Sequence, residues 1–141
     1  MNSLNFEKRY PYFGSLLAVG IWWWLGKPFP TDVKEFLAAA LTFAAILTGF
    51  LATAQAILMA LPAESVMGQI KSSGYIDELI RYMREAFIGM LLFAIINLIG
   101  FFFDTRHLPS MFAPFWVFFA ALSLFAFSRV TSIVERLMKH R

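Results

Sequence analysis

The sequence contains no cysteine, and its two histidines, His107 and His140, both lie outside the long apolar stretches. The absence of cysteine excludes disulfides, thiol nucleophiles and thiolate metal sites. His107 with the nearby Asp104 falls short of the ligands that a metal ion needs. There is also no Ser/His/Asp set, no pair of carboxylates with acid–base spacing and no glycine-rich phosphate loop. We therefore predict a protein that is not an enzyme and binds no metal or cofactor.

Charged residues are also missing from four long blocks, although 60% of the chain is apolar. The blocks cover residues 12–26, 36–61, 86–103 and 111–127. A helix crosses the hydrocarbon core of a bilayer with about 20 apolar residues. A soluble domain of 141 residues has no interior that would hide four such helices. The sequence therefore predicts an all-α membrane protein with four transmembrane helices in one domain, residues 1–141.

The Lys and Arg residues are distributed unequally between the segments that flank these blocks. Nine lie in residues 1–11, 62–85 and 128–141, against three in the two hairpin loops that join the first block to the second and the third to the fourth. Basic residues gather on the cytoplasmic side of membrane proteins. We expect a multi-pass inner-membrane protein with both termini in the cytoplasm. Topology thus explains the net charge of +3, and no direct binding of nucleic acid is expected.

Residues 62–85 are predicted to form a short cytoplasmic helical hairpin between the second and third spans. Pro62 interrupts the helix, Ser72-Ser73-Gly74 is a strong turn signal, and a helix starting near Tyr75 continues into the third span. The apolar residues of the two arms are Val66, Met67, Ile70, Ile76, Leu79, Ile80 and Met83. Two interpretations stay open: the arms pack on each other, or they dock a cytoplasmic protein partner.

The ends of two other helices are also marked. Asp32 followed by Glu35 resembles a capping box at the start of the second span. Residues 128–141 form a basic tail with an apolar stripe. This tail either lies as an amphipathic segment against the inner leaflet or continues the fourth helix.

The second span contains a stripe of small residues with 4-3-4-3-4 spacing. It consists of Ala38, Thr42, Ala45, Gly49, Ala52 and Ala56. Small residues let membrane helices approach closely, so that van der Waals contact holds them together. The stripe packs either within one chain or between several copies around an axis, and its length leads us to expect a homo-oligomer.

Two strongly hydrogen-bonding side chains, Gln55 and Asn97, lie inside the spans. Each needs a partner or water at membrane depth. They form interhelical hydrogen bonds, or they line a polar path together with Thr48, Thr53 and Thr42. The spans contain no Asp, Glu, Lys, Arg or His, which argues against a proton-coupled transporter.

A basic N-terminus, four spans, a charged central loop and a basic C-terminus resemble the small four-span membrane proteins of bacterial phage-exclusion systems (RexB-like). The resemblance implies an inner-membrane effector in antiviral defence. Such an effector forms an ion channel or perturbs the membrane when a cytoplasmic partner signals infection. The resemblance is one of architecture only, and it implies no functional role for any single residue of this sequence. The alternative hypothesis is a non-conducting membrane anchor or scaffold that docks a soluble partner through its cytoplasmic loop and tail.

Overall fold

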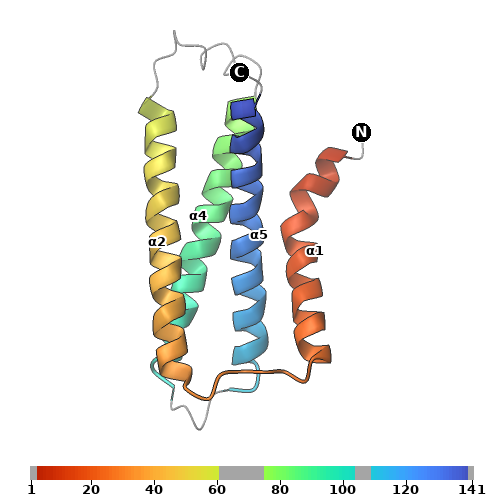
Figure 1. Ribbon diagram of the computed structural model, residues 1–141, viewed down its shortest axis with the longest axis vertical. Helices are drawn as coiled ribbons and strands as arrows, with labels where there is room; N and C mark the ends of the chain where they lie inside the picture. The colour runs from red at the N-terminus through yellow and green to blue at the C-terminus, as the bar shows by residue number, and fades with distance from the viewer. Residues whose placement is uncertain (1–2, 61–74, 104–108, 140–141) are drawn as a thin grey trace.

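The computed structural model describes residues 3–60, 75–103 and 109–139, and its regular structure there consists of four helices. They are α1 (Ser3–Trp24), α2 (Val33–Ala60), α4 (Tyr75–Gly100) and α5 (Phe112–Lys139). All four run roughly along the long axis of the molecule (Figure 1). The all-α prediction is confirmed. Residues 62–74 of the predicted hairpin, with Val66, Met67 and Ile70, lie outside the described residues.

Three of these helices are long and apolar enough to cross a membrane. The spans are Val33–Ile57, Glu78–Gly100 and Phe112–Glu135. By their length and composition, these three helices favour a membrane protein. In α1 the first turns hold Glu7, Lys8 and Arg9, so that only residues 10–24 form an uncharged stretch. Helix α1, the first of the four predicted spans, is not among these three.

Local signals in the sequence account for several helix ends. The backbone N–H of Glu35 donates to Oδ1 of Asp32 over 3.2 Å, as expected for a residue that caps the start of α2. After α1, Gly26 and Lys27 have φ of 87° and 57°. The N–H of Lys27 donates to the carbonyl of Trp22, which closes the helix as a left-handed C-terminal cap does.

Helices α4 and α5 extend beyond the predicted apolar blocks. Helix α4 starts at Tyr75 and runs unbroken to Gly100, which confirms the predicted continuation into the third span. Helix α5 likewise continues to Lys139, so the described part of the basic tail belongs to this helix and is no separate segment. Charged residues do not end either helix, because backbone hydrogen bonding is local. Four of the charged side chains also form ion pairs, Arg81 with Glu78 and Arg129 with Glu85.

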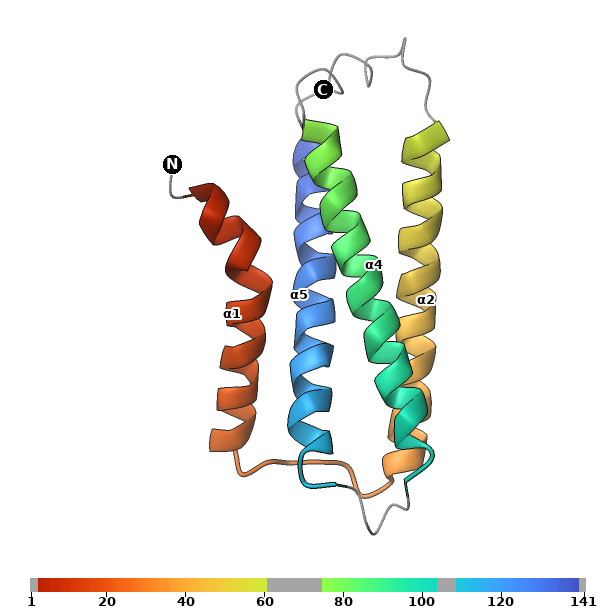
Figure 2. The same ribbon diagram turned by 180° about the vertical axis from the view of Figure 1, so that it is seen from behind.

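The helices are arranged in the order α2, α4, α5, α1, with each helix contacting its neighbour in this series. Figure 2 shows α4 between α2 and α5, and α1 on the other side of α5. One core cluster joins α2, α4 and α5 and includes Leu51, Met83 and Val130. A smaller cluster near the start of α2 contains Leu37 and Phe112. Helix α1 is thus the peripheral element of the bundle.

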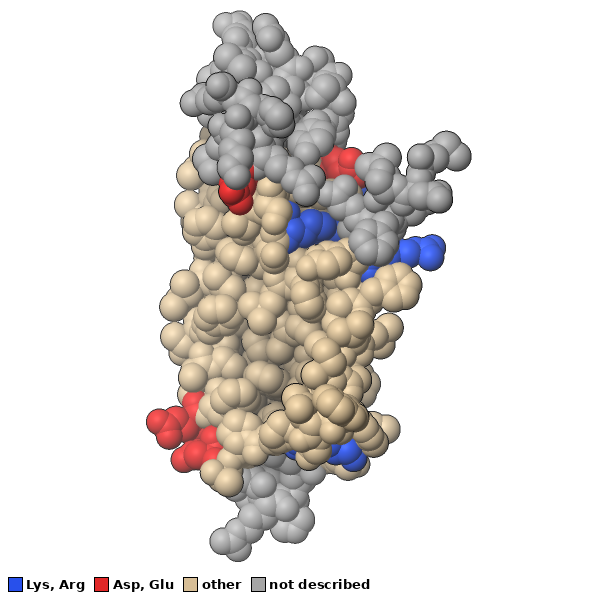
Figure 3. All heavy atoms as spheres, turned by 45° about the vertical axis from the view of Figure 1, so that its right-hand side comes forward, with Lys and Arg blue, Asp and Glu red and all other residues tan. Residues whose placement is uncertain are grey.

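The charged side chains lie towards the two ends of the molecule. On the face shown in Figure 3, a wide band without Lys, Arg, Asp or Glu separates them. Such a band matches the apolar interior of a bilayer.

Candidate functional site

The small-residue stripe of α2 lies on a surface that no described helix covers. All six residues, Ala38, Thr42, Ala45, Gly49, Ala52 and Ala56, are exposed. The buried residues of α2 lie on a different face, where Leu37, Ala44 and Leu51 pack towards the rest of the bundle. A Cβ atom added at Gly49 would meet nothing within 4 Å. The stripe therefore contributes nothing to packing within the described chain.

Asn97 has a structural role in the bundle core. Its side chain is completely buried, and its Nδ2 donates to the carbonyl of Phe93 over 2.8 Å. Its Oδ1 accepts a hydrogen bond of 2.9 Å from Nε1 of Trp116 on α5. An interhelical hydrogen bond was one of the two roles expected for Asn97. The sequence did not indicate that Trp116 is its partner.

The other residues of the predicted polar path are spread over two faces of α2. Thr48 and Gln55 are half-buried and seven residues apart, so they share one face. Thr53 is exposed and lies on the other side with Thr42. The hydroxyl of each of these three threonines donates to the carbonyl four residues earlier. Within one chain these side chains and Asn97 do not form a continuous polar path.

The described part of the predicted partner surface belongs to the core. Leu79 and Met83 are only 2% and 1% exposed and pack in the cluster that joins α2, α4 and α5. Ile80 is half-buried, and Ile76 lies in α4 at a position whose side chain is not described. Leu79 and Met83 thus pack against α2 and α5, a role that was not among the two interpretations of this stripe. Because the first arm lies outside the described residues, packing of the two arms on each other stays a prediction.

A charged and aromatic network between the first turns of α4 and the second half of α5 was missed by the sequence reasoning. Arg129 of α5 has a side chain only 5% exposed, and its Nη2 donates to Oε2 of Glu85 on α4 over 2.7 Å. The guanidinium also lies 4.0 Å from the ring centroid of Tyr82. The Tyr82 hydroxyl donates to Glu78, which forms an ion pair with Arg81. We call these five residues the α4–α5 charge network.

Three polar contacts place α4 and α5 in one antiparallel register. Besides the bonds of Asn97 with Trp116 and of Glu85 with Arg129, the hydroxyl of Ser123 donates to the carbonyl of Gly89 over 2.9 Å. Gly89 has no side chain, so this carbonyl is accessible to a neighbouring helix. A search for polar side chains at matching depths of antiparallel helices would have found Asn97 with Trp116 and Glu85 with Arg129, but not the carbonyl of Gly89.

A hollow opens between α2 and α5. It measures about 280 Å³ and is lined mainly by apolar side chains of α2, α4 and α5. Within the described ranges, no group of three or more His, Cys, Asp or Glu side chains is placed to hold a metal ion.

Compared with known proteins, the chain matches no family model, no curated protein and no solved structure.

Proposed function

We propose that the protein spans the inner membrane four times, with α1 as the first span and both termini in the cytoplasm. The excess of Lys and Arg in residues 1–11, 62–85 and 128–141 supports this orientation. The start of α1 and the end of α5 lie at the same end of the bundle (Figure 1). Trp22, Trp23 and Trp24 end α1 at the opposite end, where interfacial tryptophans anchor a span.

Reporter fusions test this topology. Fusions after Arg9, at Gly74 and at Arg141 should report the cytoplasm, because the basic segments lie there. Fusions at Pro28 and Pro109 should report the outside. An outside signal at Gly74 would contradict the model, because the basic residues of the central loop would then lie on the wrong side.

In this membrane the protein acts as a homo-oligomeric effector. The observation that carries this proposal is the exposed stripe of small residues on α2. A stripe of small residues that faces lipid gives no gain in free energy, because lipid solvates apolar side chains of any size equally well. Against the same stripe of a second copy, the two backbones approach closely and gain van der Waals contact. We therefore place α2 at the contact between copies.

Any ion path in this assembly runs between copies. The interior of one bundle is mainly apolar, and its buried Asn97 and Ser123 are already hydrogen-bonded to Phe93, Trp116 and Gly89. Between copies, the exposed Thr42 and Thr53 and the backbone near Gly49 are the groups that would face a path. Such a pore would be weakly selective, because it offers no ring of charges. The architectural resemblance adds the biological role: an effector of phage defence that responds to a cytoplasmic partner.

The assembly is tested by mass measurement in native-like lipid. Gly49→Leu should weaken the oligomer strongly, because the larger side chain separates the helices at mid-membrane. Gly20→Leu is the matched control: Gly20 is also exposed in a membrane helix with nothing within 4 Å of an added Cβ. Leu47→Ala, on the half-buried side of α2, should have a smaller effect than Gly49→Leu. A wild-type monomer would refute the proposal.

A non-conducting scaffold is the second candidate. The observation that favours it is that Asn97 and Ser123, the buried polar side chains of α4 and α5 at membrane depth, are both hydrogen-bonded inside the bundle. Ion flux into liposomes separates the two functions. An effector pore should leak ions, with a smaller leak in Gly49→Leu. An intact oligomer that shows no ion flux would support the scaffold function instead of the pore.

A further inference from the structure

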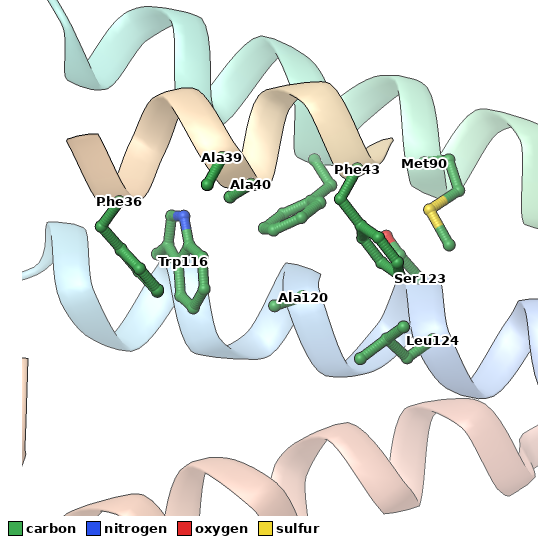
Figure 4. A pocket seen from close by; sticks show the side chains of 10 residues that line it. Phe36, Ala39, Ala40, Phe43, Met90, Trp116, Ala120, Ser123 and Leu124 are labelled. Carbon is green, nitrogen blue, oxygen red and sulfur yellow. The ribbon is translucent and has the colours of Figure 1, made fainter. Parts of the chain in front are cut away.

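The hollow between α2 and α5 is a groove whose lining combines three alanines and a serine with larger apolar side chains. Figure 4 shows Ala39 and Ala40 of α2 facing Ala120 of α5 across it. No Cα atoms of α2 and α5 approach within 8 Å, whereas both helices pack on α4. The two walls are therefore held apart by α4, and the alanines leave the space between them unfilled.

Bulky side chains close the two ends of this groove. At one end the rings of Phe36 and Trp116 lie 4.9 Å apart between centroids. Figure 4 shows Phe43 and Leu124 towards the other end. Met90 and Phe93 of α4 contribute to the lining from the third helix. The groove is thus a bounded hollow rather than a furrow along the whole bundle.

The groove lies at membrane depth, in the half of the bundle next to the start of α2 and the end of α4. Its residues on α2 fall between Phe36 and Phe43, while the helix starts at Val33. At about 1.5 Å per residue, this places the groove about 5–15 Å from the start of α2. All its lining residues fall within the three spans that are apolar enough to cross a membrane. Its surroundings are therefore the hydrocarbon of one leaflet.

Water and a second helix are both poor occupants. A buried water needs two to four polar partners, but the only polar side-chain groups of the lining, the Ser123 hydroxyl and the Trp116 ring nitrogen, donate to other residues. A helix about 10–12 Å in diameter is too wide for a hollow with closed ends. The small-residue stripe that suits a second copy lies on a different face of α2.

A flexible hydrocarbon chain fits both the chemistry and the size. An apolar cavity of about 150 Å³ holds a benzene ring, and this groove offers 280 Å³. We propose that the groove binds an acyl chain of a phospholipid from the leaflet next to the start of α2 and the end of α4. The proposal depends on the membrane placement of α2, α4 and α5. It does not depend on the oligomer, because a single copy of the protein forms the whole groove.

Trp116 provides the readout, because it lines the groove. The chain has four tryptophans, so Trp22→Phe, Trp23→Phe and Trp24→Phe together leave Trp116 as the only one. This protein is reconstituted into phosphatidylcholine vesicles whose acyl chains carry bromine, which quenches tryptophan fluorescence on contact. Quenching of Trp116 is then compared with that in variants whose groove is filled.

Ala39→Leu and Ala120→Leu fill the groove from opposite walls. Each should lower the quenching of Trp116 about twofold, because the added leucine takes the place of the acyl chain beside the ring. Ala45→Leu is the matched control, because it adds the same side chain to the exposed face of α2 away from the groove. Two filling variants keep the test valid if one of them fails to fold.

The outcomes separate this proposal from that of the oligomer. Unchanged quenching in both filling variants, or an equal loss in Ala45→Leu, would overturn the acyl-chain site. Gly49→Leu should leave the quenching intact even where it dissociates the oligomer. If Gly49→Leu lowers the quenching as much as Ala120→Leu does, the occupant comes from a second copy and the proposal is wrong.

Discussion

The α4–α5 charge network predicts unequal effects for the two partners of its interhelical ion pair. The Arg129 side chain is 5% exposed, whereas that of Glu85 is 41% exposed. Removing one partner of a fully buried pair costs about 3–5 kcal/mol. Glu85→Gln should cost less, about 2 kcal/mol, because the remaining guanidinium keeps the ring of Tyr82 as a cation–π neighbour.

Arg129→Met should lower the free energy of unfolding by only about 1 kcal/mol, which corresponds to the lost cation–π contact. The remaining carboxylate of Glu85 reaches water, and Met fills most of the buried volume. The double variant should also lose only about 1 kcal/mol, less than the two single variants together, because it leaves no buried charge.

Reversible unfolding in mixed micelles, followed by circular dichroism, measures these differences. Arg84→Met is the control, because Arg84 is exposed on the same helix; its effect should stay within about 0.5 kcal/mol. The reasoning is refuted if Glu85→Gln costs no more than Arg84→Met, or if the effects of Glu85→Gln and Arg129→Met are additive.

Two further contacts yield stability predictions in the same assay. Asn97→Leu should lower the free energy of unfolding by about 1 kcal/mol, the usual value of an interhelical hydrogen bond in a membrane. Trp116→Phe should cost less in the Asn97→Leu protein than in the wild type, because the hydrogen bond between these two side chains is already lost. Gly14→Ala should cost about 1 kcal/mol, because its Cβ would lie 2.8 Å from the ring of Phe125. Gly20→Ala, with nothing within 4 Å, should be neutral; equal effects at the two glycines would contradict the packing of α1 on α5.

The sequence alone determined the helices and several of their ends. The apolar blocks predicted α2, α4 and α5 as membrane-spanning helices, and Asp32 with Glu35 predicted the start of α2. The helix beginning near Tyr75 was also foreseen. These features depend on backbone hydrogen bonds and side chains within a few residues, and on the hydrophobicity of a continuous stretch, so they can be derived from neighbouring residues.

Only the tertiary structure decided which helix faces meet. Asn97 was recognised as needing a partner, but Trp116 supplies it from 19 residues away on another helix. Arg129 was counted as part of a basic tail, whereas α5 carries it into the core beside Glu85. Leu79 and Met83 formed an apolar stripe whose use was open, and the packing of α2, α4 and α5 buries them. The rotation and depth of each helix depend on the fit of several side chains at once, which periodicity along one helix does not specify.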